Sequence, residues 1–438
     1  MSPREVLSER LPPMHIIQAD LTLVDDAFVP DLAVAIAADG TIERVESASG
    51  TATLRLSGQA LLPGMINAHS HAFQRALRGR TERFGAIGGN FWSWREQMYA
   101  LAEEMDASRL RRVCVQAFRE MLSRGITTVG EFHYLHHDDS GKGYALDNIV
   151  LEAAAEAGIR IVLLNTYYTT GGIGQPLAGA QRRFGTPSVP EFLEHCQRLA
   201  ERVDSRTQQI GLAAHSIRAV PIDDIIQLVR AAEQNGWVLH MHVEEQVQEL
   251  KECADAFGTT PMRLLLEQVD LGPFFTAVHC THTFGQPLEE FLESGGNVCI
   301  CPTTEADLGD GIPDMPTIMA NDGAVCLGSD SNVRIDLIEE LRWLEHVQRV
   351  SRRERGVCRD AEGNVAATLW RCATRFGARS LGINAGTISA GRHADLFTID
   401  LNHPMLSEVP PEQLLDALVF AGDGGLVRRV CVGGKWIV

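Results

Sequence analysis

Residues 110–134 read LRRVCVQAFREMLSRGITTVGEFHY, and this stretch contains the repeating unit of the predicted fold. Between Leu110 and Met121 the apolar side chains recur at intervals of three and four residues, which predicts a helix with one buried face. Gly125 ends that helix, and residues 126–134 follow as an apolar strand. The unit is therefore a helix, a glycine and a strand.

The same unit recurs along the chain. We expect eight strands, near residues 61–71, 127–134, 160–168, 209–217, 237–245, 276–282, 297–304 and 324–331. Apolar strands that alternate with helices form a parallel sheet covered on both faces, which places the chain in the α/β class. Eight units over roughly 300 residues favour a closed (β/α)8 TIM-like barrel over an open sheet.

The two ends of the chain follow a different pattern. Short segments of alternating hydrophobicity, separated by turn signals, occupy residues 14–60 and again residues 386–438. One small β domain assembled from both termini is the simplest explanation. We therefore predict an N-terminal part of this domain over residues 1–62, the barrel over 63–383 and the C-terminal part over 384–438.

Composition excludes several classes of function. The chain has 438 residues and a net charge of −18, which repels phosphate backbones, so no nucleic-acid partner is expected. No apolar stretch approaches the ~18 residues of a membrane span, and the charged first fourteen residues are unlike a signal peptide. The ten scattered cysteines form no C-x-x-C motif. These features predict a cytoplasmic protein with reduced thiols and no membrane partner.

Histidines and carboxylates stand at the predicted ends of four strands. His69 and His71 are two residues apart on the first strand, so their side chains point to the same face. The other strand ends carry His240, His242 and Glu245 on the fifth, His279 on the sixth and Asp330 on the eighth. Since active sites of such barrels lie where the strands end, these groups converge on one mouth. Three histidines and a carboxylate are a ligand set for a divalent metal ion.

Longer strings around these residues resemble a known family. Pro63-Gly64-Met-Ile-Asn67-Ala-His69-Ser-His71, with the later histidines and aspartate, resembles the amidohydrolase superfamily. More narrowly, the chain resembles the formiminoglutamate deiminases in His69-Ser-His-Ala-Phe-Gln-Arg75, Phe91-Trp-Ser-Trp-Arg95-Glu, Glu131-Phe-His-Tyr134-Leu-His-His-Asp138, His215-Ser-Ile-Arg218 and Thr304-Glu-Ala-Asp-Leu-Gly-Asp-Gly311. This resemblance implies a distorted (β/α)8 barrel with a small β-sandwich over essentially the whole chain.

The resemblance also implies a metal centre. His240 and His242 share strand parity, so the pattern alone leaves either as a ligand; the family's His-x-x-Glu motif selects His242 and leaves His240 as a core histidine. The implied ligands are His69, His71, His242 and Asp330. Binuclear members of the superfamily bridge their ions with a carboxylated lysine, and none of the three lysines, Lys142, Lys251 and Lys435, lies on a predicted barrel strand. One divalent metal is expected, Zn²⁺ with Fe²⁺ as the alternative.

The implied reaction is hydrolytic deimination of N-formimino-L-glutamate to N-formyl-L-glutamate and ammonia, a step of histidine degradation. In this mechanism Asp330 accepts the proton of the attacking water, and His279 steadies the tetrahedral centre. Glu245 protonates the leaving nitrogen. Each of these three residues is therefore an expected catalytic residue.

The resemblance implies substrate contacts from Gln74, Arg95, Tyr134, His215 and Arg218. Because the guanidinium groups of Arg95 and Arg218 can each pair with a carboxylate in bidentate fashion, the expected substrate is a small dicarboxylate. Surface ion pairs remain the alternative for both arginines.

Two other functions compete with this one. They are an aminohydrolase of a purine, pterin or triazine ring and a catalytically silent scaffold. Since superfamily members are usually oligomers, a homodimer is expected. The roles of His133, His136, His137, Asp307 and Asp310 stay open.

Overall fold

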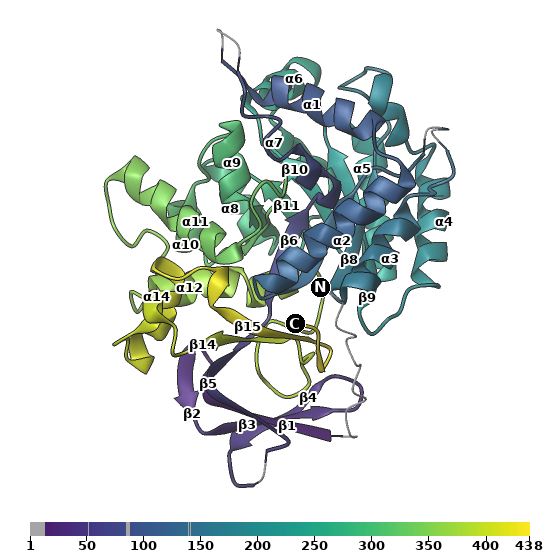
Figure 1. Cartoon of the computed structure of the whole chain (residues 1–438). Helices are drawn as coiled ribbons and strands as arrows, with labels where there is room; N and C mark the ends of the chain where they lie inside the picture. The colour runs from purple at the N-terminus through teal and green to yellow at the C-terminus, as the bar shows by residue number, and fades with distance from the viewer. Residues whose placement is uncertain (1–13, 51, 85–87, 139, 141) are drawn as a thin grey trace.

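The computed structural model describes residues 14–50, 52–84, 88–138, 140 and 142–438. The first thirteen residues, on which the signal-peptide argument rests, lie outside the described residues. A large body of strands and helices lies above a small sheet, and that sheet combines the purple N-terminal and the yellow C-terminal parts of the chain (Figure 1).

The large body is the expected parallel barrel. Its strands follow the chain order from β6 to β13, each paired with the next: β6 (Met65–Ser70), β7 (Ile126–His133), β8 (Arg160–Tyr167), β9 (Gln208–Ser216), β10 (Leu239–Val243), β11 (Phe275–His279), β12 (Asn297–Ile300) and β13 (Ala324–Leu327). The ring closes where β6 meets the segment after β13, since the Asp330 N–H donates to the His69 carbonyl over 3.0 Å and the His71 N–H to the Asp330 carbonyl over 2.9 Å. The seam of the barrel thus runs through candidate site residues.

Helices pack around the barrel and over its mouth (Figure 1). They are α1 (Phe91–Glu103), α2 (Ala107–Ser123), α3 (Asp147–Ala157), α4 (Val189–Ala200), α5 (Ile222–Asn235), α6 (Val247–Phe257), α7 (Pro261–Gln268), α8 (Gln286–Glu293), α9 (Pro302–Leu308), α10 (Met315–Ala320), α11 (Leu337–Arg352), α12 (Val365–Cys372), α13 (Arg375–Ser380) and α14 (Leu414–Phe420). The stripe from Leu110 to Met121 on α2 is buried as the periodicity predicts, and Gly125 follows with a left-handed φ of 79°.

Both ends of the chain form the small sheet. Its strand order is β16-β15-β14-β5-β1-β3-β4, with β2 paired to β1, and the bounds are β1 (Met14–Val24), β2 (Ala27–Pro30), β3 (Leu32–Ala37), β4 (Ile42–Ser47), β5 (Leu54–Pro63), β14 (Leu396–Asp400), β15 (Val427–Val432) and β16 (Lys435–Trp436). The N-terminal and C-terminal strands meet where β5 pairs antiparallel with β14. The expected fold class, a barrel with a small β domain from both termini, is confirmed.

The prediction of a single first strand near residues 61–71 was wrong in one respect. It is two strands in two sheets, because β5 ends at Pro63 in the small sheet and β6 begins at Met65 in the barrel. Gly64 lies between them, and a Cβ there would stand 2.0 Å from Thr127 Oγ1. The chain therefore changes sheets at a residue whose close backbone approach only glycine allows.

A buried ion pair joins the two sheets. Arg160, the first residue of β8, donates from Nε to Asp395 Oδ2 over 2.6 Å and from Nη2 to Asp395 Oδ1 over 3.0 Å. Both side chains are buried, and the Gly433 N–H of the small domain also donates to Asp395. The pair therefore fixes the small sheet against the barrel.

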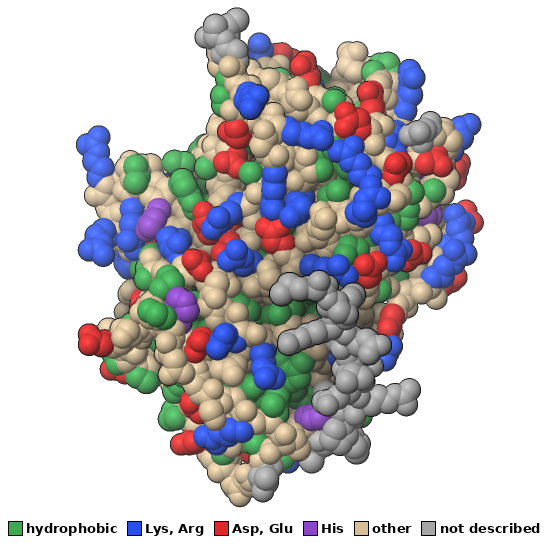
Figure 2. Space-filling view, viewed as in Figure 1, with side chains coloured by type: hydrophobic (Ala, Val, Ile, Leu, Met, Phe, Trp, Pro, Cys, Tyr) green, Lys and Arg blue, Asp and Glu red, His purple; other side chains and the backbone are tan. Residues whose placement is uncertain are grey.

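The surface mixes both signs of charge. Arg75 and Arg78 pair with Glu120, and Arg111 pairs with Glu152 and Glu156. Figure 2 shows blue and red side chains interspersed on this face of the molecule. All ten cysteines are free and buried. Within the described ranges, no helix is both long enough and apolar enough to cross a bilayer.

Candidate active site

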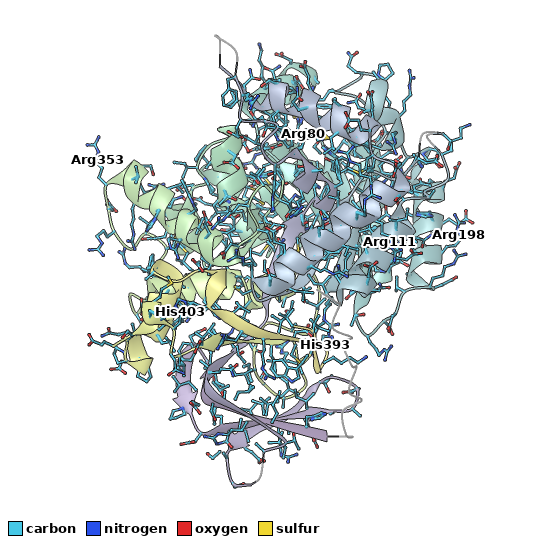
Figure 3. The ribbon with its side chains drawn as sticks, in the orientation of Figure 1. Arg80, Arg111, Arg198, Arg353, His393 and His403 are labelled. Carbon is cyan, nitrogen blue, oxygen red and sulfur yellow. The ribbon has the colours of Figure 1, made fainter. Side chains whose placement is uncertain are left out.

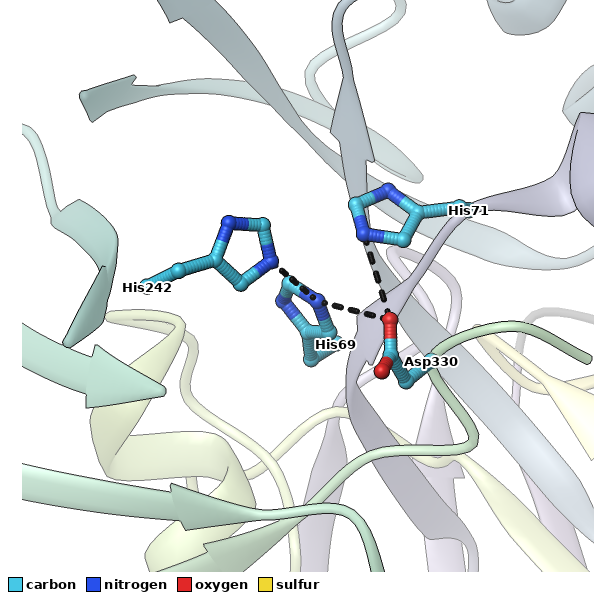
Figure 4. A group of neighbouring side chains, drawn as sticks. All are labelled: His69, His71, His242 and Asp330. Atoms are coloured by element: carbon cyan, nitrogen blue, oxygen red, sulfur yellow. Dashed lines mark hydrogen bonds and ion pairs between the residues drawn. The ribbon is translucent and has the colours of Figure 1, made fainter. Parts of the chain in front are cut away.

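Three histidines and an aspartate meet at the carboxyl ends of the barrel strands. His69 comes from β6, His71 from just after it, His242 from β10, and Asp330 from the segment after β13. His69 Nε2 lies 3.3 Å and His71 Nε2 3.2 Å from Asp330 Oδ1, while His242 Nε2 lies 3.2 Å from His69 Nε2 (Figure 4). One ligand atom from each of the four lies within 4.8 Å of the others, and all four side chains are buried. The tertiary structure brings the four expected ligands together.

Backbone carbonyls orient two of these imidazoles. His71 Nδ1 donates to the Phe132 carbonyl over 2.8 Å, and His242 Nδ1 donates to the His215 carbonyl over 2.9 Å. Because a carbonyl only accepts, each of these two rings carries a proton on Nδ1 and presents Nε2 to the group. Burial lowers the pKa of His69 to about 3 and holds that of His242 well below its usual value, so both are neutral at pH 7.

The donor set fits a divalent cation. The Nε2 atoms of His69, His71 and His242 and Asp330 Oδ1 lie 3.2–3.3 Å from their nearest neighbours in the group, a spacing that suits a cation between them. Burial opposes ionisation of Asp330, but its contacts with His69 and His71 hold its pKa well below the usual range. His240 is outside this group, since its Nε2 bonds the Ser380 carbonyl over 2.9 Å. That places His240 in the core, as the sequence interpretation expected.

The backbone around the group is tightly constrained. Asp330 adopts a left-handed φ of 45°, a conformation that costs a residue other than glycine about 1–3 kcal/mol. Two residues earlier, a Cβ on Gly328 would stand 2.6 Å from His69 Cβ and 2.9 Å from Cys301 Sγ. Only glycine therefore lets this segment approach β6 closely enough for Asp330 to reach His69 and His71.

His279 and Glu245 lie beside this group. His279 Nε2 is 3.9 Å from both Asp330 Oδ2 and Glu245 Oε1, and its Nδ1 lies 3.2 Å from Glu305 Oε1. Burial disfavours the charged imidazole, yet Glu245, Glu305 and Asp330 together raise the pKa of His279 to about 10. Glu305 also accepts from the Cys301 N–H, so its carboxylate is held in place from α9.

Two arginines border the pocket above the group, and they differ in their partners. Arg218 is buried, with Nη2 3.3 Å from Glu245 Oε2 and Nε 3.5 Å from Glu249 Oε2. Arg95 instead stacks its guanidinium 4.2 Å from the Trp92 ring centroid, and within the described part of the chain it makes no ion pair. The more available cation in the pocket is therefore Arg95.

The other expected contacts line the same pocket. Gln74 donates to the Tyr134 hydroxyl over 2.7 Å, which leaves its buried Oε1 without a hydrogen bond in the described structure. Burial raises the pKa of Tyr134, which stays a neutral phenol. Burial and the nearby Arg218 hold the pKa of His215 well below its usual value. Gln74 Oε1 is thus an acceptor, and Tyr134 and His215 are uncharged polar groups.

Sequence reasoning missed two carboxylates that support the site. Glu305 contacts His279, and Glu249, the buried partner of Arg218, has a pKa that burial raises to about 7. Glu305 lies within a string quoted for the resemblance, so that string was the available signal; Glu249 lies on α6 with no local pattern to mark it. Of the residues left open, Asp310 accepts a hydrogen bond from Gln246 Nε2, and neither Asp307 nor Asp310 lines the pocket.

Comparison with known proteins identifies the family of this chain. The model of the Amidohydrolase family matches residues 60–437. This chain belongs to the amidohydrolase family. It is 37% identical over 431 residues to formimidoylglutamate deiminase of Pseudomonas aeruginosa, covering 97% of this chain and 95% of the relative. It is 28% identical to a 5-methylthioadenosine/S-adenosylhomocysteine deaminase of Natronomonas pharaonis, covering 90% and 84%.

Solved structures agree with this assignment. An amidohydrolase from Brucella melitensis superposes with a TM-score of 0.88 at 33% identity, covering 96% of this chain and 94% of that one. An adenosine deaminase from Xanthomonas campestris with bound zinc shares the fold at a TM-score of 0.80 and 22% identity, covering 96% and 92%. The family is metal-dependent, which accords with the buried histidine and aspartate group, and the chain is a hydrolase of C–N bonds.

Proposed function

We propose that this chain hydrolyses N-formimino-L-glutamate to N-formyl-L-glutamate and ammonia, and so acts in histidine degradation. The observation that carries this proposal is a pocket with two guanidinium groups, Arg95 and Arg218, on a chain of net charge −18. Placing cations over a buried active site in so acidic a protein suits an anionic substrate. The 37% identity to the Pseudomonas deiminase supports the same substrate.

His69, His71, His242 and Asp330 would hold one divalent ion. We propose Zn²⁺, because three imidazole nitrogens and one carboxylate oxygen suit it and because a structural relative contains zinc; Fe²⁺ is the alternative. Such an ion would supply an activated water at neutral pH.

The protein's own groups then move the protons. In the proposed reaction, Asp330 accepts a proton from the attacking water as oxygen adds to the formimino carbon. His279 Nε2, between Asp330 and Glu245, donates a hydrogen bond that steadies the tetrahedral centre. Glu245, as the carboxylic acid, donates a proton to the terminal nitrogen as the tetrahedral centre forms. The proton on Asp330 then passes to the same nitrogen, the hydroxyl proton of the tetrahedral centre returns to Glu245 as the carbonyl forms, the C–N bond breaks, and ammonia leaves. Glu245 is positioned for this transfer by Arg218 on one oxygen and His279 on the other.

The remaining contacts bind the substrate. Arg95 and Arg218 would each pair with a carboxylate, while the free Oε1 of Gln74 would accept from a substrate N–H. Tyr134 and His215 border the same pocket with neutral polar groups. The expected cytoplasmic location and homodimer remain predictions that accompany this function.

A metal-loaded sample tests the proposal. The protein is given formimino-glutamate and, separately, a panel of purines, pterins and triazines, and ammonia release is measured. We expect release from formimino-glutamate alone, loss of turnover on exhaustive chelation and recovery with Zn²⁺. Release only from the ring compounds would overturn the substrate assignment, and unchanged turnover after chelation would overturn the role of the metal. Asp330→Asn serves as the inactive control.

A further inference from the structure

A second buried group of histidines surrounds Asp147, away from the pocket. His133 ends β7, His136 follows it, Asp147 begins α3, and His195 lies on α4, so the group joins a barrel strand to two helices, α3 and α4, that lie side by side in Figure 1. All four side chains are buried, with exposures between 0% and 9%. None of them lines the active-site pocket. The group therefore belongs to a separate place in the fold.

Two imidazoles share one oxygen of Asp147. His133 Nε2 lies 3.2 Å and His136 Nδ1 lies 3.0 Å from Asp147 Oδ1. The pattern matches the active site, where two imidazoles lie 3.3 and 3.2 Å from Asp330 Oδ1. The three ligand atoms of His133, His136 and Asp147 lie within 4.8 Å of one another. Their spacing is therefore that of the group that would hold the catalytic ion.

Each of these rings presents one nitrogen to the carboxylate. His136 Nε2 bonds the Thr166 carbonyl over 2.7 Å, and since a carbonyl only accepts, the ring donates there. The other nitrogen of His136, Nδ1, faces Asp147 Oδ1. His133 Nε2 is buried and has no hydrogen-bond partner in the described structure, although Asp147 is close. A single proton on His136 would leave His133 unsatisfied, whereas one cation between the three would satisfy all of them.

Two neighbours hold the outer oxygen of the carboxylate. Asp147 Oδ2 accepts from His195 Nε2 over 2.8 Å and from Asn165 Nδ2 over 2.9 Å, as the outer oxygen of a metal-bound carboxylate does. Oδ1 therefore remains the oxygen that faces His133 and His136.

We propose that His133 Nε2, His136 Nδ1 and Asp147 Oδ1 form a second, structural binding site for a divalent transition-metal ion of the Zn²⁺ type. His195 and Asn165 orient the carboxylate from outside. With three protein ligands, a tetrahedral ion has one position for water. The site ties β7 and β8 to α3 and α4, and β7 also provides the Phe132 carbonyl that orients His71. The inference is independent of the proposed substrate.

Metal content tests this site on the full chain. Protein loaded with Zn²⁺ and passed through a desalting column is analysed for zinc per chain by inductively coupled plasma mass spectrometry. We expect two equivalents in the wild type and one in Asp330→Asn, whose active site has lost its carboxylate. Asp147→Asn should hold one and the double variant none. His240→Asn removes a buried histidine that, in the described part of the chain, bonds a backbone carbonyl and no carboxylate; it is the matched control and should hold two.

The same samples decide between a metal and a proton. If the group is only an imidazolium–carboxylate pair, the wild type holds one equivalent and Asp330→Asn none, which overturns the proposal. This comparison does not depend on Asp147→Asn, so it stands even if that variant does not fold. As a second readout, chelation should lower the melting temperature of Asp330→Asn by several degrees. An unchanged melting temperature together with zero zinc would also overturn the site.

Discussion

Arg95 offers the sharpest test of substrate recognition. Its guanidinium stacks 4.2 Å from the Trp92 ring and 5.5 Å from the Tyr99 ring, and within the described residues no carboxylate pairs with it. Arg95→Met therefore removes a charge without leaving a buried partner unpaired, and the free energy of unfolding should change by less than about 1 kcal/mol. Arg218 differs, because its removal would leave buried Glu249 without its arginine partner and Glu245 with His279 alone.

The size of the effect follows from the contact that is lost. A hydrogen bond to a charged group contributes about 1.5–3 kcal/mol, and about 1.4 kcal/mol is tenfold in affinity. Arg95→Met should therefore raise KM for formimino-glutamate by roughly 10- to 150-fold, with kcat changed much less. The assay measures ammonia release under steady-state conditions at several substrate concentrations.

Two monoacid analogues identify the carboxylate that Arg95 binds. N-formimino-γ-aminobutyrate lacks the α-carboxylate, and N-formimino-α-aminobutyrate lacks the γ-carboxylate. For the analogue that lacks the group bound by Arg95, the variant and the wild type should have the same KM. Arg198→Met is the control, because this arginine pairs with Glu194 on α4 and points away from the barrel (Figure 3). A KM within about twofold of the wild type, or an equal rise for both analogues, would refute the reasoning.

Three further predictions concern buried carboxylates. Glu305→Gln weakens the orientation of His279, so kcat should fall about tenfold, ~1.4 kcal/mol, with KM nearly unchanged; a rise in KM alone would contradict this. Asp395→Asn leaves Arg160 buried without its partner, so urea unfolding should show a loss of about 3–5 kcal/mol, and a loss below about 1 kcal/mol would contradict the buried pair. Burial holds the pKa of Glu340 in the folded protein well above its value in the unfolded chain. The protonated side chain therefore makes its full contribution to the free energy of unfolding below the unfolded pKa, and that contribution is lost as pH rises through the folded pKa. The melting temperature of the wild type should therefore fall more between pH 5 and pH 8 than that of Glu340→Gln; equal falls would contradict the assignment.

The fold could be predicted because its signals are local. The stripe from Leu110 to Met121 and the stop at Gly125 record the helix and its end in adjacent residues, and the unit repeats. The break between β5 and β6 could not be read in this way. Both strands are apolar and only one residue separates them, so their assignment to different sheets depends on the contact between Gly64 and Thr127.

The sequence likewise predicted some residues of the candidate site and missed others. His69, His71 and Asp330 stand at strand ends in recognisable strings, because the period of a strand and the polarity of a parallel barrel determine where such side chains gather. His240 and His242 share strand parity, and only the resemblance to the family selected His242. Glu249 could not be found, since an acidic residue on an amphipathic helix has no local mark of burial. The sequence also could not predict that Arg218 pairs with Glu245 and Glu249 while Arg95 pairs with no carboxylate in the described structure. Ion pairing depends on carboxylates that other elements bring close.

The amino-acid sequence alone determined the alternation of helices and strands, the parallel barrel with a small domain from both ends, and the identity of the groups at its mouth. Only the tertiary structure decided which of those groups touch, that the barrel closes through His69 and Asp330, and that His133, His136 and Asp147 meet behind β7. The physical reason is that periodicity and chain reversals are properties of neighbouring residues. Distances between side chains tens or hundreds of residues apart are instead fixed by how all the elements pack at once.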